Sequence, residues 1–377
     1  MKTLVLALLL SQPWLSAEQS YGPYSRPQLG GRHAMAVGAD GILMAWSENA
    51  PQPRIHVALL DTRAQLISPI SILPAEDATA ESYAPTVSSS GDAFLVAWVE
   101  RYRGAERVRG AVVDRSGVPV TAPQTYGLAK IQFSFNGPEE LVTPFIAWDG
   151  AGWHVWGGNR VFTILPNGER ISDSNPWPDV HAAMYENAVF ATATSKKTPI
   201  YRGCFLFRCE HYADRWDVVW TAGDGKGSEQ VGDEWGKGSD SVSEPSLAAT
   251  GDQFALAWSS TLGIGYTLTS SSIRARTVDA IVKVDAAPGL ACDDERCVIA
   301  YETTGGDVQA IVFETDDLRS PELLTIAATE RKERAPLVHH LGSGRFLVSY
   351  LSDQGDADRR INGRILTLRP PRRRAVR

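Results

Sequence analysis

Residues 91–98 read GDAFLVAW, and residues 251–258 read GDQFALAW. Two such similar octapeptides in one chain indicate an internal repeat. Aligned on their final aromatic residue, six copies of one template appear: a proline (His33 in the first copy), a short apolar strand, a turn with glycine, a second apolar strand and a Trp or Tyr. The aromatic residues that end the six copies are Trp46, Trp98, Trp156, Trp258, Tyr301 and Tyr350.

Each copy continues with further strand-like segments, so that about 50 residues hold four strands. A fourth short strand often follows the third, as at 68–73. The expected third strands are 54–61, 107–114, 272–279, 307–314 and 360–367.

The second strand of the template is apolar on both faces. In 91–98, Phe94, Val96 and Trp98 share one face, while Leu95 and Ala97 share the other. A strand with one wet face would alternate apolar and polar residues. A sheet covered on both sides fits a blade packed between two neighbouring blades. The repeat therefore predicts an all-β protein, a β-propeller of four-stranded antiparallel blades.

The blade count follows from the spacing of the aromatic residues. The gap between Trp156 and Trp258 is twice the usual step, so we expect a divergent copy near 170–225 with Trp220 as its aromatic residue. This gives about seven blades, with six or eight as alternatives. Residues 18–30 are expected to supply the fourth strand that the last copy lacks. Tandem β-sandwiches are the runner-up, but 50 residues are too few for such a domain.

The two ends of the chain differ from the repeat region. Lys2, the apolar run 4–10 and the small residues near Ala17 predict a signal peptide over 1–17. The apolar run is shorter than the roughly 18 residues that span a membrane. We therefore expect a secreted or periplasmic protein without a membrane span, with a propeller over 18–368 and a basic tail over 369–377.

Charge is unevenly distributed along the chain. The whole chain carries −7, but residues 18–368 hold 31 basic and 44 acidic residues, a net charge of −13. So acidic a body argues against nucleic acid as a partner. The tail RPPRRRAVR is expected to be a disordered arm: a solvated end, a contact to a polyanionic surface, or an export signal. We expect a monomer.

Four cysteines form two C-x4-C pairs, Cys204 with Cys209 and Cys292 with Cys297. In an exported protein this pattern predicts two local disulfides. Zinc is an alternative because thiolates prefer it, but the spacing is loose and no pair of histidines accompanies it. Free thiols are the remaining alternative.

The second half of the repeat is clearest in VRGAVVDRSG, residues 108–117. Together with the FLVAW-type strand, it resembles repeats of secreted bacterial β-propeller proteins. The resemblance covers most of 18–368 except about 170–240. It implies a propeller fold and export, and it implies no catalytic residues.

The second turns of the copies are long, varied and charged, whereas the first turns are short and similar. Because binding residues concentrate on variable loops held by a rigid frame, the second turns are the expected binding face. Trp235 lies in the Gly-rich segment 223–240, which is expected to be a long loop, and is a candidate for stacking on a sugar or a partner. The candidate ligand-binding residues are Glu48, Glu100, Arg103, Trp235, Glu302, Asp353, Asp356 and Arg359.

The sequence predicts no cofactor, no metal site and no catalytic residue. Asp353, Asp356 and Asp358 lack the spacing of a strong calcium loop, and two arginines follow them. His339 and His340 are adjacent on a first strand, so their side chains are expected to point to opposite faces.

The expected function is non-catalytic binding of a protein or glycan partner outside the cytoplasm. The alternative is a carbohydrate-active hydrolase or lyase, which would need two carboxylates facing each other. The S-x-D-x-G-x-T-W box of sialidase blades is absent from the sequence. A mainly structural envelope protein is the third possibility.

Overall fold

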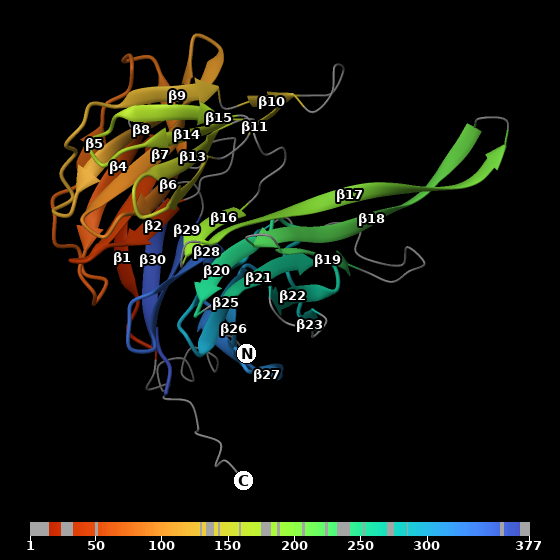
Figure 1. Ribbon diagram of the computed structural model, residues 1–377. Coiled ribbons are helices and arrows are strands. Elements are labelled where there is room, and N and C mark those ends of the chain that lie inside the picture. Colours follow the sequence, from red (N-terminus) through yellow and green to blue (C-terminus); the bar gives the residue numbers. More distant parts are fainter. Residues whose placement is uncertain are drawn as a thin grey trace. The chain divides into compact units, whose positions relative to one another are not determined.

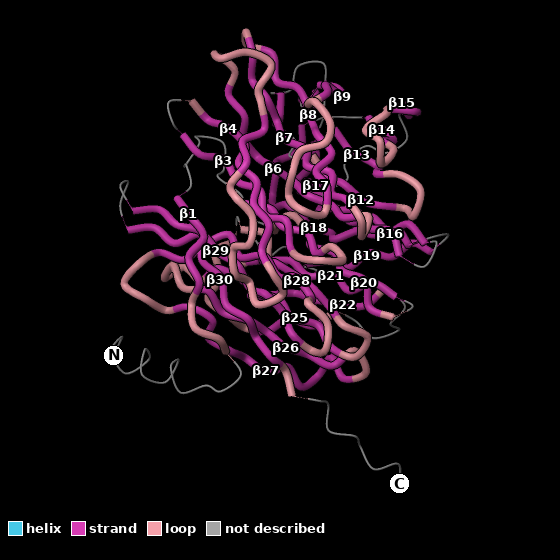
Figure 2. Tube along the Cα trace, turned by 90° about the vertical axis from the view of Figure 1, so that its left-hand side faces the viewer, coloured by secondary structure: helices cyan, strands magenta, loops and turns pink. Residues whose placement is uncertain are grey.

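The computed structural model describes most of the chain, and this part contains strands and loops but no helix (Figure 2). Accordingly, the described part holds no helix of the length and apolarity needed to cross a membrane. The described residues are 15–23, 33–49, 52–128, 130–132, 139–141, 144–157, 160–174, 182–186, 189–205, 208–222, 225–231, 242–251, 253–269, 275–284, 286–354 and 358–369.

The strands form seven four-stranded antiparallel sheets, which are the blades of a β-propeller (Figure 1). Each blade follows the chain from its first to its fourth strand, except the last, whose fourth strand comes from the N-terminal region. The all-β propeller with seven blades that the repeat predicts is confirmed. A further two-stranded sheet joins β10 (Lys130–Gln132) and β11 (Glu139–Leu141).

The chain divides into two compact units. The first, which we call the 16–179 unit, also includes residues 349–365 and holds three complete blades. The strands of these blades are β2 His33–Val37, β3 Ile42–Asn49, β4 Pro53–Leu60 and β5 Ser71–Leu73; β6 Glu81–Ser89, β7 Ala93–Tyr102, β8 Ala105–Asp114 and β9 Gln124–Leu128; β12 Phe145–Trp148, β13 Trp153–Gly157, β14 Arg160–Ile164 and β15 Arg170–Ser174.

The second, the 180–348 unit, also includes residues 1–15 and 366–377 and holds three further complete blades. Their strands are β16 Ala182–Glu186, β17 Val189–Phe205, β18 Arg208–Ala222 and β19 Gly225–Val231; β20 Ser246–Thr250, β21 Gln253–Ser260, β22 Gly263–Leu268 and β23 Arg276–Val278; β24 Gly289–Cys292, β25 Arg296–Glu302, β26 Val308–Glu314 and β27 Asp317–Ala327.

The last blade combines strands from both ends of the sequence. Its order is β1-β30-β29-β28, with β28 at Lys332–His340, β29 at Arg345–Gln354 and β30 at Asp358–Thr367. The strand β1 (Gln19–Pro23) pairs antiparallel with β30. The N-terminal segment thus supplies the fourth strand that the last repeat lacks, as its sequence predicts.

Alternate residues of the second strands pack into two different hydrophobic cores, and these strands are therefore apolar on both faces. Phe94, Val96 and Trp98 of β7 pack with residues of the preceding β2–β5 blade. Leu95, Ala97 and Val99 of the same strand pack with residues of the following β12–β15 blade. Burying apolar surface on both sides at about 25 cal/mol per Å² holds neighbouring blades together.

The aromatic residue that ends each template copy is almost fully buried, as Trp98, Trp258 and Tyr301 show. Trp258 packs with the β16–β19 blade before it, and Tyr301 packs with the β20–β23 blade before it. These residues therefore fill the space between a blade and its predecessor. The same burial is found for Trp46, Trp156 and Tyr350.

Two expected strand positions are wrong. Trp220 lies on β18, the third strand of its blade, and not on the second strand, where the other aromatic residues lie. In the β20–β23 blade the third strand is β22 (Gly263–Leu268), whereas the expected 272–279 segment holds the fourth strand, β23. Part of the Gly-rich 223–240 segment, expected to be a loop, forms β19.

The first turns have the geometry that their glycines predict. Gly91 and Gly251 have φ values of 93° and 58°, in the left-handed region that side chains disfavour. An added Cβ would meet no atom within 4 Å at either position, so the backbone conformation alone requires glycine.

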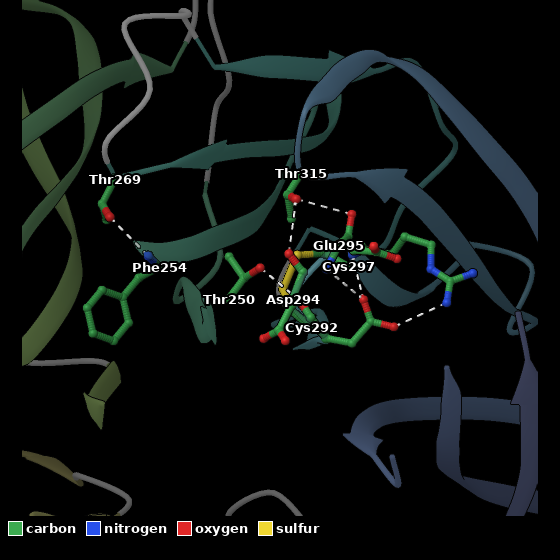
Figure 3. Close-up of a disulfide and its surroundings, with 10 residues drawn as sticks. Thr250, Phe254, Thr269, Cys292, Asp294, Glu295, Cys297 and Thr315 are labelled. Atoms are coloured by element: carbon green, nitrogen blue, oxygen red, sulfur yellow. Dashed lines mark hydrogen bonds and ion pairs between the residues drawn. A yellow bond between two sulfur atoms is a disulfide. The ribbon is translucent and has the colours of Figure 1, made fainter. Parts of the chain in front are cut away.

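The first turn of the β24–β27 blade is closed by a disulfide between Cys292 and Cys297 (Figure 3). The two cysteines are register partners on β24 and β25, so the bond staples the hairpin as predicted. The Oγ1 of Thr250 donates to the carbonyl of Asp293 at 2.8 Å, which ties this turn to the preceding blade. The side chains of Cys204 and Cys209 lie outside the described residues, and their disulfide stays a prediction.

Candidate functional site

The structure places the expected ligand-binding residues at the ends of second and third strands. Glu48 ends β3, Glu100 lies near the end of β7, and Arg103 lies in the turn that follows β7. Glu302 ends β25 in the other unit. Asp353 and Arg359, both half-buried, lie on β29 and β30, while Trp235 and Asp356 are outside the described residues.

Glu100 is buried and fixed by groups of its own chain. Its side chain is 1% exposed, and its Oε1 accepts a hydrogen bond from Nη1 of Arg109 at 2.7 Å. Oε1 also accepts from the backbone N–H of Glu76 at 3.1 Å, and Oε2 accepts from the hydroxyl of Ser82 at 3.3 Å. The oxygens of Glu100 therefore hold the loop before β6, and its role in ligand binding stays a prediction.

A second buried carboxylate on the same hairpin is also paired. Nη2 of Arg101 donates to Oε1 of Glu106 at 2.6 Å, and the hydroxyl of Tyr83 donates to the same oxygen at 2.7 Å. Burial, followed by this hydrogen bond, raises the pKa of Tyr83. The hydrogen bond to Glu106 raises the pKa of Arg101. Both shifts keep the Tyr83 hydroxyl and the Arg101 guanidinium protonated at neutral pH.

The other candidates in the 16–179 unit are more open. Oε2 of Glu48 lies 3.5 Å from Nδ1 of His56, whose pKa is lowered by burial against an opposing effect of Glu48. Arg103 is exposed, with a φ of 51° and its guanidinium 4.9 Å from the ring centre of Tyr102. Of the expected residues that the structure describes in this unit, only Arg103 has a side chain classed as exposed.

In the 180–348 unit, Glu302 resembles Glu100 in its role. Its Oε1 accepts from Nζ of Lys283 at 3.1 Å, and its Oε2 accepts from the backbone N–H of Ala335 at 3.3 Å. Ala335 has a φ of 47°, so the carboxylate fixes a strained backbone turn before Pro336. Among the described residues, no group of three His, Cys, Asp or Glu side chains could hold a metal ion.

A different feature of the 16–179 unit faces solvent: a set of aliphatic side chains at the third turns of three consecutive blades. Ile67, Val120 and Ile171 are 54%, 56% and 53% exposed. Seven of the large hydrophobic residues that are exposed in the described part belong to this set, which we call the third-turn surface: Leu66, Ile67, Ile70, Ile72, Val118, Val120 and Ile171.

Ile67, Val120 and Ile171 occupy equivalent backbone positions. The third turns of the first two blades are closed by backbone hydrogen bonds from Asp61 to Gln65 and from Asp114 to Val118. Leu165 donates to Glu169 in the same way in the third blade. Each exposed aliphatic residue follows the acceptor by two positions, so the repeat presents the same kind of side chain three times.

The three turns also lie against one another. A Cβ added to Gly117 would lie 3.2 Å from Oγ of Ser68 in the preceding blade. A Cβ added to Gly168 would lie 2.8 Å from Cγ2 of Thr121 in its own preceding blade. Contacts this close place the third turns of neighbouring blades side by side and bring their exposed aliphatic residues into one region. An exposed apolar surface of more than a few hundred Å² is uncommon for isolated monomers.

The third-turn surface is not part of the binding face that the sequence predicts, although the sequence of the third turns contains a signal for it. The third turns begin with Asp61 and Asp114, whose Oδ1 atoms accept from backbone N–H groups two and four residues later. Aligning the turns on these aspartates would have placed Ile67 and Val120 at one position.

Comparison with known proteins bears on the fold. No family model and no curated protein matches the chain. The WD40 domain of Neurospora crassa Pan2 matches with 9% identity and a TM-score of 0.50, over 90% of each chain. A protein of unknown function from Dyadobacter fermentans matches with 12% identity and a TM-score of 0.50, over 95% of this chain and 100% of that one.

A third similar structure is the β-propeller domain of the Trilobed protease from Pyrococcus furiosus. It shares 9% identity and a TM-score of 0.49, over 88% of this chain and 94% of that one. At identities this low, the similarity shows that the propeller fold is shared and says nothing about the activity of this chain.

Proposed function

We propose that this chain is an exported, non-catalytic β-propeller that binds a protein partner through the third-turn surface. The observation that supports this proposal is the repetition of Ile67, Val120 and Ile171 at equivalent, half-exposed positions on three adjoining turns. Exposed apolar surface that is gathered in this way marks interaction sites.

The chemistry of the surface favours a protein over a glycan. Seven aliphatic side chains that are each about half exposed present on the order of several hundred Å² of apolar surface. Glycan sites instead rely on aromatic platforms and convergent polar groups. The buried carboxylates Glu100, Glu106 and Glu302 are engaged by cations of their own chain, which suits a rigid frame better than a hydrolytic site.

Export is the second element of the proposal. The predicted signal peptide over 1–17 supports it, and the Cys292–Cys297 disulfide is compatible with an oxidising compartment. The FLVAW-type resemblance supports the same location.

The proposal is tested by site-specific photo-crosslinking in cells that export the chain. A photoreactive phenylalanine at position 120 should give a defined protein adduct, whereas the same group at the exposed Arg319 position on β27 should not. Adding Ile67→Asp and Ile171→Asp to the position-120 variant should abolish the adduct. If the adduct persists in that triple variant, or if position 319 gives the same adduct, the third-turn surface is not the contact.

A glycan array with the same proteins tests the competing ligand class. Strong glycan binding that is unchanged by Ile67→Asp and Ile171→Asp would place the function elsewhere on the propeller.

A further inference from the structure

The hairpin of β17 and β18 in the β16–β19 blade has the longest strands among those that the structure describes. β17 and β18 pair with each other from Ala191↔Ala222 to Phe205↔Arg208. The neighbour β16 pairs with β17 only as far as Ala193, and β19 pairs with β18 only from Trp216 onward. The distal part of the hairpin is therefore a two-stranded ribbon beyond the four-stranded sheet (Figure 1).

We call residues 196–205 and 208–217 the arm. Beyond the last β19 partner, Trp216, each strand continues for eight residues, and six register pairs join the two strands there. The ribbon therefore reaches roughly 25 Å past the sheet. A two-stranded ribbon on its own is marginally stable in water. Beyond Trp216, the arm thus has two faces and two strand edges without a partner from the described strands of its blade, which is the situation of an element that docks on another surface.

The composition of the arm differs from that of the rest of the chain. It holds five basic residues and three acidic ones, a net charge of +2, while the remainder of 18–368 holds 26 basic and 41 acidic residues, a net charge of −15. It is also rich in large apolar and aromatic residues. The basic residues are Lys196, Lys197, Arg202, Arg208 and Arg215, and the aromatic and aliphatic ones are Ile200, Tyr201, Phe205, Tyr212 and Trp216.

The register places aromatic and basic residues together toward the distal end of the arm and further basic residues at its base. Phe205 is the register partner of Arg208, and Tyr201 that of His211. Lys196 and Lys197 lie at its base, where they pair with Asp217 and Trp216. Tyr201 and Phe205 thus lie toward the end of the arm, and basic residues lie both at its end and at its base.

We propose that the arm is a docking element for an anionic lipid surface. Tyrosine and phenylalanine are suited to the boundary between headgroups and acyl chains, because one part of the side chain is apolar and the tyrosine hydroxyl stays wet. Lysine and arginine extend their apolar stems while keeping the charge at the headgroups, and each basic residue near such a surface contributes about 1 kcal/mol. The acidic remainder of the chain is repelled by the same surface, so the arm is the part that approaches it.

A protein partner is the less favoured occupant. Strand addition to the arm would need an edge with few charges, whereas both strands of the arm carry basic residues that oppose pairing with another strand. The proposal is independent of the third-turn surface, which lies in the other unit and contains no basic residue.

The test is co-sedimentation of the full chain, with its predicted signal peptide removed, on vesicles of phosphatidylcholine with and without phosphatidylglycerol. We expect binding to the anionic vesicles only, and weaker binding at high salt. Lys196→Glu with Lys197→Glu should lower the affinity about tenfold or more, since it reverses two charges. Tyr201→Ala with Phe205→Ala should also lower the affinity while keeping its salt dependence.

Matched controls keep the test specific. Arg63→Glu with Arg319→Glu reverses the same number of charges at exposed positions outside the arm and should leave lipid binding within a factor of two. Deleting 370–377 measures the contribution of the basic tail. An unchanged circular dichroism spectrum and melting temperature show that the arm variants fold.

Three results would overturn the proposal. The first is equal binding to neutral and anionic vesicles, or no binding to either. The second is loss of binding on tail deletion with no effect of the arm variants. The third is a concentration-dependent dimer in sedimentation velocity that the arm variants abolish while lipid binding is absent, which would make a second copy of the chain the occupant.

Discussion

Oε1 of Glu100 on β7 lies 2.7 Å from Nη1 of Arg109 on the neighbouring strand β8, and both side chains are buried. Nη2 of Arg109 donates to the carbonyl of Pro123 at 2.9 Å, and Glu100 receives the backbone N–H of Glu76. One buried ion pair therefore connects the hairpin to the loops on either side of its blade. Removing one partner of such a pair leaves an uncompensated buried charge.

Glu100→Gln should accordingly lower the free energy of unfolding by about 3 kcal/mol or more. The measurement is urea denaturation followed by tryptophan fluorescence. Glu76→Gln is the matched control, because Glu76 pairs with Arg107 at 3.2 Å where both side chains are more than a third exposed. An exposed pair of this kind contributes at most about 1 kcal/mol. Equal decreases in the free energy of unfolding of the two variants would show that the effect of Glu100→Gln does not come from the burial of Glu100.

The disulfide of the β24–β25 hairpin gives a second prediction. Cys292→Ser with Cys297→Ser should lower the free energy of unfolding by about 2 kcal/mol, since the bond closes a short loop in the unfolded chain. Thermal denaturation with and without reductant measures the effect, and reductant should not affect the stability of this blade in the variant. Mass spectrometry of the same variant after thiol alkylation then tests the other predicted bond, between Cys204 and Cys209. Free thiols at these two positions in the unreduced variant would contradict that prediction.

The sequence was sufficient for the blades because the residues that make a blade are the residues that repeat. Phe94, Val96 and Trp98 recur as Phe254, Leu256 and Trp258, and the structure packs both sets between blades. The pairing of β1 with β30 was predictable for a similar reason, since the last copy lacked one strand and the N-terminal segment was unassigned.

The divergent blade could not be placed in detail because its second strand is longer and more polar than those of the other blades. β17 continues into the arm, so its sequence is rich in Thr, Ser and Lys where the other second strands are apolar. The nearest apolar run belongs to the third strand, and Trp220 was therefore placed one strand too early. In the next blade Gly265 lies on β22, where a Cβ would come within 2.3 Å of the Trp258 ring, and such glycines conceal a strand from sequence analysis.

The third-turn surface was harder to foresee than the fold. Charged residues such as Glu100 and Glu302 attracted the functional hypothesis, yet the folded chain uses them to fix its own loops. The exposure of Ile67 and Val120 depends on the hydrogen bonds that close their turns and on the contacts between neighbouring turns. Such tertiary contacts cannot be read from the sequence.

The side chain of His339 on β28 predicts how stability depends on pH. Burial lowers its pKa to about 4 from an ordinary value of 6.5. Between these values the unfolded chain binds a proton at this histidine that the folded chain does not bind, so stability falls as the pH decreases from 6.5 to 4. The loss from this residue amounts to at most about 3 kcal/mol, and it is absent above pH 6.5.

His339→Gln should flatten this dependence. Urea denaturation of the unmodified chain and of the variant at several pH values between 4 and 7 gives the difference in their free energies of unfolding. The carboxylates contribute equally to both proteins, so the difference reports the contribution of His339. His340→Gln is the control, because His340 is less buried and has Asp293 and Asp294 nearby to oppose the lowering of its pKa. A difference curve that is flat across the window for His339→Gln would contradict the prediction.

The pairing of β1 with β30 makes the last prediction. Gln19 and Ser20 are register partners of Gly363 and Asn362, and Glu18 accepts hydrogen bonds from Nδ2 of Asn362 at 2.9 Å and from the hydroxyl of Tyr350. Deleting 18–28 should therefore lower the melting temperature by about 5 °C or more, because β30 becomes an unpaired edge and the Tyr350 hydroxyl loses its acceptor.

Differential scanning calorimetry of the deletion variant measures this effect, with deletion of 370–377 as the control that removes a comparable length from the other end. Glu18→Gln separates the two contributions, since it keeps the backbone pairing and removes the charge beside Arg364, which lies 3.6 Å away. We expect this substitution to account for less than half of the decrease, because strand pairing is the larger loss. A melting temperature that does not change on deleting 18–28 would mean that the last blade is stable with three strands.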